Sequence, residues 1–279
     1  PLHNPANLKG VNAVTELMPG LPQVGVFDTA FHQTMPAKAY LYAVPYELYE
    51  KYGVRRYGFH GTSHRYVSAR ALEFLGMKAE GTKVVTAHIG NGGSLAAVVD
   101  GKCVDTTMGL TPLEGVMMGT RSGDIDGGAV AFIQKKLGLD ADGISDLLNK
   151  KSGIAGLTGL SSDMRDIENA ANAGNERAQI AQDSYFYRIK KYVGAYAAAM
   201  GGIDVLVFTA GVGENQTPMR EDVCRGLEFM GIKIDAEKNA KIRGEEAIIS
   251  TPDSRVKVVV IPTDEELMIA SDTMALISK

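Results

Sequence analysis

The sequence predicts an α/β fold in which a mixed sheet is flanked by helices. Short runs rich in valine and other β-formers alternate with longer helical patterns, as is typical of this class. Asp100-Gly101 separates two of these runs and is a signal for a tight hairpin, so the middle of the sheet is predicted to be antiparallel. The runs at 204–211 and 255–262 are each separated by helix, which favours parallel strands there.

The elements follow in order along the chain. We expect strands at 23–27 (QVGVF), 82–90 (TKVVTAHIG), 94–100 (SLAAVVD), 101–107 (GKCVDTT), 204–211 (DVLVFTAG) and 255–262 (RVKVVVIP). Helices are expected near 63–75, 126–137, 141–150, 163–173, 176–201, 217–230 and 264–277. The glycine-rich stretch at 151–166 is predicted to be a loop, which the apolar residues Ile154, Leu157 and Leu160 would tether to the core.

Composition narrows the classes of function. The chain has 279 residues, 45% of them hydrophobic, and a net charge of −4, which gives no general attraction for nucleic acid or an acidic membrane. The two cysteines, Cys103 and Cys224, form no CxxC or Cys/His pattern, which argues against a disulfide framework or a zinc site. No signal peptide or twenty-residue apolar stretch is visible, and the most apolar run, 256–261, has the length of a strand. We therefore expect a cytoplasmic protein whose partners are small molecules.

Two glycine-rich turns follow predicted strands and are candidates for binding phosphate. In FTAGVGENQTP, 208–218, a buried strand leads into glycines and then into a helix for which Thr217-Pro218 is the expected start. In HIGNGGS, 88–94, a second turn joins two strands and can surround phosphate oxygens with backbone N–H groups. A plain strand-to-helix turn and a bulged hairpin are the structural alternatives. Two such turns at one sheet edge favour a phosphate site.

Acidic residues lie at the ends of several elements. Thr263 and Glu266 form a predicted capping box, which leaves Glu265 available. Carboxylate oxygens such as those of Asp28 and Glu265 suit magnesium that is also held by water and nucleotide phosphates. Asp124 and Asp126 are expected to cap the helix that begins near Ile125, or to brace Arg121.

The segment YGFHGTSHRY, 57–66, contains two histidines four residues apart. Because Gly61-Thr62-Ser63 is predicted to be a loop and helix N-cap, His60 should precede the helix that carries His64, which excludes a helical zinc pair. For either histidine alone, a structural role is the default. Arg121 lies in another glycine-flanked loop, where a surface salt bridge is the structural alternative. An arginine and an imidazole donor can together stabilise the charge that develops in phosphoryl transfer.

Six motifs together resemble the acetate kinase family: FDTAFHQTMP, YGFHGTSH, HIGNGGS, TPLEGVMMGTRSGDID, FTAGVGEN and IPTDEE, which occur in order along essentially the whole chain. The resemblance implies an actin-like ATPase fold of the ribonuclease H-like type, and reversible phosphoryl transfer between ATP and acetate that gives acetyl phosphate and ADP by direct in-line transfer. It also implies a magnesium ion, or manganese in its place, and a homodimer.

The resemblance assigns roles to particular residues. His60 and Arg121 match transition-state stabilisers, Asp28 matches an essential aspartate, and Glu265 matches a metal-linked glutamate. The matches to the apolar acetate pocket are Leu2, Phe59 and Pro112. The matches to nucleotide contacts are His88, Ile89, Gly90, Asn91, Gly92, Asp163, Met164, Arg165, Gly211, Val212, Gly213, Glu214 and Asn215. The family more often has phenylalanine at the position of Met164.

One departure from the family pattern concerns its first lobe. The family begins with a strand, a loop that carries an asparagine, and a later arginine that holds the carboxylate, and this chain contains none of them. Residues 1–29 and 264–279 are therefore expected to be a remnant of the first, acid-binding lobe, and 30–263 the nucleotide-binding lobe. We expect these 279 residues alone to bind nucleotide without appreciable turnover. A propionate or butyrate kinase and a non-kinase nucleotide-binding protein of the actin type remain alternatives.

Overall fold

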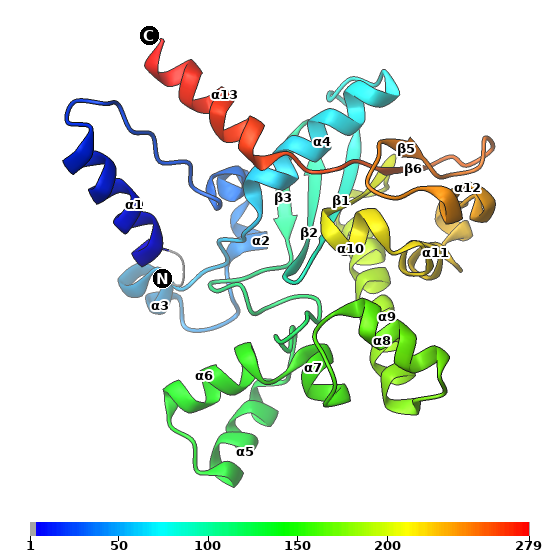
Figure 1. Ribbon diagram of the computed structural model, residues 1–279, viewed down its shortest axis with the longest axis horizontal. Coiled ribbons are helices and arrows are strands. Elements are labelled where there is room, and N and C mark those ends of the chain that lie inside the picture. Colours follow the sequence, from blue (N-terminus) through cyan, green and yellow to red (C-terminus); the bar gives the residue numbers. More distant parts are fainter. Residues whose placement is uncertain (1–3, 279) are drawn as a thin grey trace.

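The computed structural model describes residues 4–278 and has a six-stranded sheet with helices on both faces (Figure 1). The elements before the second half of the sheet are α1 (Asn4–Leu17), η1 (Ala30–Thr34), α2 (Ala37–Tyr40), α3 (Tyr46–Tyr52), α4 (Gly61–Leu75), β1 (Lys83–Ile89), β2 (Gly93–Val99), β3 (Lys102–Thr106), α5 (Gly127–Leu137), α6 (Ala141–Lys150), α7 (Gly153–Thr158), α8 (Met164–Asn172) and α9 (Glu176–Met200). They are followed by β4 (Val205–Thr209), α10 (Ala210–Asn215), α11 (Thr217–Cys224), η2 (Glu228–Met230), α12 (Ala236–Lys241), β5 (Ala247–Ile248), β6 (Lys257–Val260) and α13 (Glu265–Ile277).

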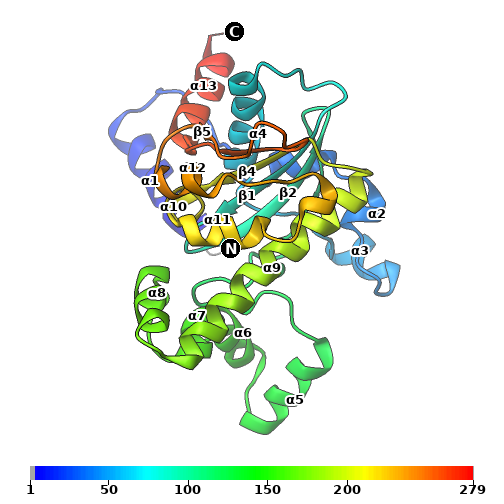
Figure 2. The same cartoon turned by 90° about the vertical axis from the view of Figure 1, so that its right-hand side faces the viewer.

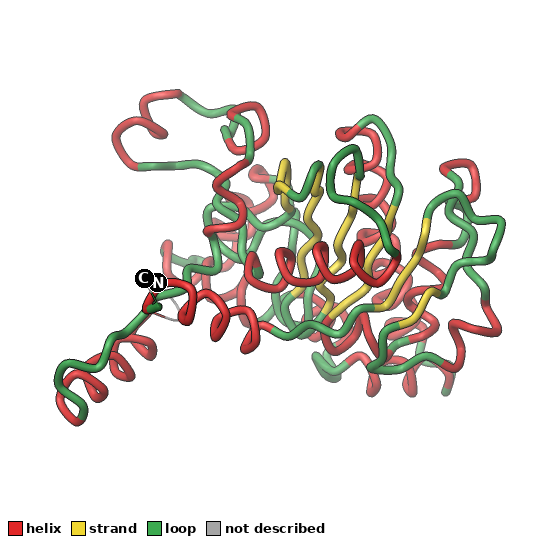
Figure 3. The backbone as a smooth tube through the Cα atoms, turned by 90° about the horizontal axis from the view of Figure 1, so that it is seen from above, coloured by secondary structure: helices red, strands yellow, loops and turns green. Residues whose placement is uncertain are grey.

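The sheet is mixed, as predicted, with the strand order β3-β2-β1-β4-β6-β5. Figure 3 shows the strands side by side, in yellow, with helices around them. The strands β1, β2 and β3 pair antiparallel, whereas β4 pairs parallel with both β1 and β6. Asp100 and Gly101 both have positive φ, 53° and 74°, as a tight hairpin between β2 and β3 requires. Because β1 and β4 are parallel neighbours, the loops that follow them emerge at the same edge.

The central strand β1 is buried on both faces. Val84 packs in one apolar cluster with Val67 and Ala71 of α4. Val85 and Ile89 pack in the other, larger cluster, which includes the buried side of α9. Burial on both faces explains why this strand appears in the sequence as a nearly continuous apolar run rather than as an alternating one. It also places Thr86 and His88 on the α4 face, among the side chains of that helix.

Several element predictions were wrong. Residues 23–27 form no strand but an irregular segment, because no described strand lies beside them to pair with. The stretch 151–166 contains α7 and the start of α8; of its three proposed tethers Ile154 is buried, whereas Leu157 and Leu160 are exposed. The helix expected at 217–230 ends at Cys224 and is followed by η2. Sequence patterns missed α1, η1, α2, α3, α12 and β5, of which all but α1 are seven residues or shorter.

The helix starts also differ in detail. Asp264, not Thr263, caps α13 and accepts a hydrogen bond from the backbone N–H of Leu267 at 2.8 Å, so the proposed capping box is absent. The helix α11 begins at Thr217 after Gln216 as its N-cap. At α5 the predicted cap is correct, because Asp126 accepts from the N–H of Ala129 at 2.9 Å.

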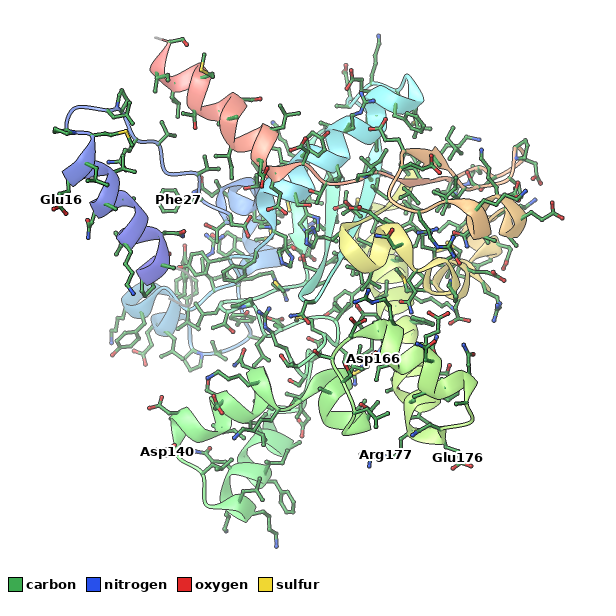
Figure 4. The ribbon with its side chains drawn as sticks, in the orientation of Figure 1. Glu16, Phe27, Asp140, Asp166, Glu176 and Arg177 are labelled. Atoms are coloured by element: carbon green, nitrogen blue, oxygen red, sulfur yellow. The ribbon has the colours of Figure 1, made fainter. Side chains whose placement is uncertain are left out.

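Three parts lie away from the sheet. The α5–α6 pair extends from the body below α7 (Figure 2), and α1 and α13 lie beyond the face covered by α4 (Figure 1). Phe27, labelled in Figure 4, follows α1 and is 75% exposed. The division into lobes at residues 29 and 264 stays a prediction. Within residues 4–278, no helix has both the length and the apolar character needed to span a bilayer.

Candidate active site

A cavity of about 830 Å³ opens at the sheet edge where β1 and β4 end. Its size is in the usual range for small-molecule sites. Eight predicted nucleotide residues line it: Gly90, Asn91, Asp163, Met164, Arg165, Gly211, Val212 and Asn215. They come from the turn after β1, the start of α8 and the helix α10, so the structure brings three separated motifs to one cavity.

The other five predicted nucleotide residues do not line this cavity. Ile89 is fully buried in the core, and a side chain at Gly213 would contact the backbone of Ala87 and Phe208. The Glu214 carboxylate accepts from the N–H of Ala210 at 2.7 Å and of Thr263 at 3.1 Å, so it joins α10 to the loop before α13. His88 and Gly92 lie instead beside His60.

The glycine-rich segment after β4 is a short helix rather than the open turn that its sequence suggests. Ala210 begins this helix with φ of 66°, a left-handed conformation that is uncommon outside glycine. The bond that its N–H donates to Glu214 holds the backbone in place. The sharp bend turns α10 toward the cavity.

At the start of α8, Asp163 acts as the helix cap and accepts from the N–H of Arg165 at 2.9 Å. The side chains also form an ion pair at 2.5 Å. The side-chain hydrogen bond from Arg165 lowers the pKa of Asp163 to about 2. Met164 is buried in the larger apolar cluster and also lines the cavity, which fits an apolar residue at this position.

Sequence reasoning missed part of the cavity wall. The additional lining residues are Gly119, Ile154, Ser162, Glu168, Tyr185, Gln216, Thr217, Pro218 and Arg243. Arg243 lies in KIRGEE, a short charged run without a glycine motif, so no local signal marks it. Thr217 and Pro218 belong to the segment 208–218, and the helix start that they predict is the signal that could have placed them in the cavity wall.

Asp28 lies at the N-terminus of α4. Its carboxylate oxygens accept from the N–H of His60 at 2.5 Å and of Thr62 at 3.3 Å. Its carbonyl oxygen accepts from Gly61, where a side chain would come within 2.2 Å of that oxygen. His60 has φ of 56° and directly precedes the helix, which begins at Gly61 rather than at the N-cap expected at Ser63.

His60 and Arg121 converge on Gly92. A Cβ atom built on Gly92 would lie 3.5 Å from His60 Nε2 and 3.4 Å from Arg121 Nη1. On its other side, the His60 ring stacks on His88 with ring centroids 4.1 Å apart. Two groups that can donate hydrogen bonds to an anion therefore face one small space next to the turn after β1.

Arg121 is half-buried and its Nη1 donates to the Pro112 carbonyl at 3.1 Å. Burial lowers the pKa of this guanidinium. Within residues 4–278 no carboxylate forms an ion pair with Arg121, so the surface salt bridge considered for it is not found there. Asp124 does not brace it, but accepts from the N–H of Gly115 and from Tyr192.

Glu265 lies in the first turn of α13 and is half-buried. Burial first, and then the negative charge of Asp28, raise the pKa of its carboxyl group. In the part of the chain that is described, no group of three or more histidine, cysteine, aspartate or glutamate side chains could hold a metal on its own. Two neighbouring carboxylates still suit magnesium, which often takes its other ligands from water and phosphate.

The predicted acetate pocket is only partly in view. Leu2 lies outside the described residues. Pro112 is buried, and its carbonyl accepts a hydrogen bond from Arg121. The carbonyl of Phe59, which directly precedes His60, accepts from His32 Nε2 at 2.9 Å. The structure therefore places Phe59 and Pro112 beside the two convergent donors. His64 is fully buried behind them and lies on α4, as predicted.

Comparison with known proteins gives one consistent family. Residues 1–271 match the model of the acetokinase family. The chain is 71% identical to the acetate kinase of Bacteroides thetaiotaomicron over 279 residues, which is all of this chain and 70% of that protein. It is 64% identical to the Thermotoga maritima acetate kinase over 281 residues, again 100% of this chain and 70% of the relative.

Solved structures agree in fold. The Porphyromonas gingivalis acetate kinase superposes with a TM-score of 0.97 at 63% identity and covers 99% of this chain and 69% of its own. A propionate kinase from Francisella tularensis gives a TM-score of 0.91 at 46% identity, over 98% of this chain and 69% of its own. The α/β class with its helix-flanked mixed sheet, as in actin-like ATPases, is confirmed, and the chain belongs to the acetokinase family.

Proposed function

We propose that this protein is an acetate kinase, which transfers a phosphoryl group between ATP and acetate to give acetyl phosphate and ADP. The observation that carries the proposal is the convergence of His60 and Arg121 on Gly92, next to the cavity at the ends of β1 and β4. Identity of 71% to a curated acetate kinase supports the same reaction.

In this proposal the nucleotide lies in the cavity, with its phosphates directed along the turn at Gly90–Gly92. In-line transfer moves the terminal phosphoryl group to a carboxylate oxygen of acetate without a covalent enzyme intermediate. Negative charge on the transferring group is stabilised by the Arg121 guanidinium and by a donor on the His60 ring. Asp28 fixes the position of His60 through its backbone N–H.

We propose that Glu265, with Asp28 beside it, lies at the site of a magnesium ion, with manganese as a substitute. The ion neutralises phosphate charge when it is bound. The donor set supports this, because carboxylate oxygens are the ligands that such ions prefer. Burial, and after it the negative charge of Asp28, raise the pKa of Glu265, and a cation bound beside the two carboxyl groups would favour their charged forms.

Activity is best measured on the chain preceded by the strand and loop that the family pattern places ahead of it, here called the extended chain. We expect the extended chain to bind ADP and to form acetyl phosphate from acetate and ATP. Failure of the extended chain to phosphorylate any short carboxylate, while it binds ADP, would favour a non-kinase nucleotide-binding protein.

A kinase for a longer acid is the second candidate, because a Francisella tularensis propionate kinase is 46% identical to this chain. The two readings differ in acceptor preference. We expect a higher kcat/KM for acetate than for propionate or butyrate, since the acetate kinases compared are more similar to this chain. A preference for butyrate would overturn the acetate assignment.

We also propose a cytoplasmic homodimer. Cys103 and Cys224 are buried and free, as is usual in a reducing compartment. The homodimer is suggested by the family resemblance, and sizing chromatography with light scattering tests it.

A further inference from the structure

His60, the proposed catalytic histidine, is connected to a chain of hydrogen-bonded, buried polar side chains. His60 Nδ1 lies 2.8 Å from Ser94 Oγ, and Ser94 Oγ lies 2.8 Å from Nε2 of His64. On its other side, His64 Nδ1 lies 2.7 Å from Thr86 Oγ1. The side chains of Ser94, His64 and Thr86 are fully buried, so bulk solvent does not reach them.

These groups have few N–H and O–H protons to donate, which limits the possible directions of their hydrogen bonds. Ser94 and Thr86 have one hydroxyl proton each, and His64 is neutral because burial lowers its pKa well below the usual value. A neutral His64 donates from one ring nitrogen and accepts at the other. The hydrogen-bond chain therefore has two possible orders. In the first order Thr86 donates to His64, His64 donates to Ser94, and Ser94 donates to His60. In the reversed order the direction of all three hydrogen bonds is opposite.

The Thr86 hydroxyl distinguishes the two orders. Within residues 4–278, His64 Nδ1 is its only hydrogen-bond partner. In the reversed order His64 donates to Thr86, and among the described residues the Thr86 proton then has no acceptor. An unmet buried donor disfavours that order by about tenfold or more. In the first order every hydroxyl proton of the chain is used.

We propose that Ser94, oriented by His64 and Thr86, is a positioning residue that holds neutral His60 in the tautomer with its proton on Nε2. The proposal rests on the proposed function for its meaning, since Nε2 is the nitrogen on the side of Gly92 and Arg121. The ring then presents a donor to the phosphoryl group without having to be charged. The same device fixes the tautomer of histidines that receive a hydrogen bond at their other nitrogen.

The tautomer can be observed directly. The 279-residue chain is labelled with ¹⁵N-histidine, and two-bond ¹H–¹⁵N correlation spectra are recorded at neutral pH. The ring signals are assigned from His60→Gln and His64→Gln spectra. We expect both His60 and His64 to carry the proton on Nε2. A His60 ring with its proton on Nδ1 in the unmutated chain would overturn the proposal, whatever the variants do.

Variants test the role of the Ser94 hydroxyl. In Ser94→Ala, His60 loses the donor at Nδ1, and we expect a signal that reports a mixture of tautomers or the Nδ1–H form. Ser68→Ala is the matched control, because Ser68 is also buried and its hydroxyl donates to the Arg65 carbonyl of α4, and among the described residues it has no hydrogen bond to a histidine. An unchanged His60 tautomer in a folded Ser94→Ala chain would refute the role of Ser94.

Turnover of the extended chain gives a separate measurement. We expect Ser94→Ala to lower kcat by about tenfold, the equivalent of one hydrogen bond, with KM for ATP and acetate within about twofold. Equal kcat in Ser94→Ala and the unmutated protein would refute a role in catalysis. The two proposals fail separately: loss of acetate kinase activity in the unmutated extended chain would refute the function, whereas the NMR result decides the tautomer independently.

Discussion

Gly92 is the residue at which His60 and Arg121, the two proposed hydrogen-bond donors to the phosphoryl group, meet. A Cβ atom there would make ordinary contacts with His60 and Arg121, and its φ is not in the left-handed region. We therefore expect Gly92→Ala to fold with unchanged stability while its methyl group occupies space needed by the transferring phosphoryl group. Turnover of the extended chain should fall at least tenfold, since small misplacements of reactants cost about a hundredfold.

A control separates this effect from a general cost of alanine. Gly127 begins α5, and a Cβ atom there has nothing within 4 Å, so Gly127→Ala should leave turnover unchanged. Urea unfolding of both variants checks that stability is preserved. Normal turnover in Gly92→Ala would show that the space beside His60 and Arg121 is not used in the reaction.

Arg121 provides a second prediction at this scale. It donates only to Pro112 and, weakly, to Met118 Sδ at 3.7 Å among the described residues, so its charge is available to an anionic ligand. In Arg121→Ala we expect kcat of the extended chain to fall about a thousandfold or more, with the Kd for ADP little changed. Arg177→Ala is the control, because Arg177 lies on α9 and binds the Leu157 carbonyl outside the cavity (Figure 4). A comparable loss in both variants would contradict the assignment.

At the scale of elements, one buried arginine holds α10 in place. Arg220 on α11 is fully buried and donates to the carbonyl oxygens of Gly213 and Glu214, at the end of α10. It also donates to Asn239 Oδ1 on α12 and to the Ile242 carbonyl. Burial lowers the pKa of this guanidinium to about 10, yet it stays protonated at neutral pH. One side chain thus connects three helices beside the cavity.

We expect Arg220→Met to lower the free energy of unfolding by about 3–5 kcal/mol, because several buried acceptors lose their donor. The affinity for ADP should also fall, since α10 lines the cavity. Arg225→Met is the control: Arg225 is exposed, and its ion pairs with Glu221 and Asp222 should contribute less than about 1 kcal/mol. Urea unfolding and calorimetric ADP titration measure the two effects. Equal stability of the two variants would contradict a structural role for Arg220.

The packing of α4 against β1 also predicts how stability depends on pH. Burial lowers the pKa of His32, His64 and His88, so the folded state binds fewer protons at these rings than the unfolded chain does near pH 6.5. In the unfolded chain they take up protons near pH 6.5. The free energy of unfolding should therefore be fully retained above about pH 7 and fall toward pH 5.5, by at most about 1.4 kcal/mol per histidine per pH unit.

Urea unfolding between these pH values measures the slope. In His88→Asn, which removes one of the three imidazoles, we expect a shallower slope. A flat profile in the unmutated chain would contradict the prediction. The measurements stay above pH 5 because the raised pKa of Glu265 increases the free energy of unfolding as the pH falls further, which is opposite to the effect of the histidines.

Sequence patterns predicted the elements whose signals are local. The hairpin at Asp100-Gly101 was predicted because its turn residues determine the geometry themselves. The cap of α13 was assigned wrongly, since Thr263 and Asp264 are adjacent and both are good capping residues; only the chain path selects Asp264. The apolar run at 23–27 predicts a strand, and this prediction was wrong because a strand also requires a neighbour, which sequence alone does not reveal.

For the candidate site, the limit of sequence reasoning was spatial. Motif resemblance identified His60 and Arg121 together, but their convergence on Gly92 depends on the strand order and on the fold of a loop far along the chain. Arg243 and Glu168 reach the cavity only because α8 and the segment after α12 lie at its sides. The Ser94–His64–Thr86 chain likewise requires α4 to lie over β1 and β2.

At the scale of the whole molecule, apolar side chains are exposed on α1 and α13. On α1 these are Leu8, Val11 and Leu17, and on α13 they are Leu267, Ile269, Met274, Leu276 and Ile277. Surfaces of this kind favour association. We expect the 279-residue chain to elute above its monomer mass of 29.8 kDa in sizing chromatography with light scattering, increasingly so at higher concentration.

A charged variant tests this expectation. Met274→Glu together with Leu276→Glu should shift the chain toward the monomer, because both changes replace exposed apolar side chains. Lys135→Glu on α5 is the control: it changes the net charge but leaves the exposed apolar area of α1 and α13 unchanged, so it should not shift the chain toward the monomer. A monomer at all concentrations in the unmutated chain would contradict the prediction.

The adjacency of β1 and β4 has a mechanical consequence. The turn after β1 and the helix after β4 begin on strands that are hydrogen-bonded to each other, so their spacing is set by the sheet repeat of about 4.8 Å. A sheet is stiff along this direction, so the distance between the two strand ends that face the nucleotide's phosphates stays fixed. Any opening or closing around the nucleotide must then come from a hinge outside the sheet, and inhibitors that span both ends would meet a surface that does not yield.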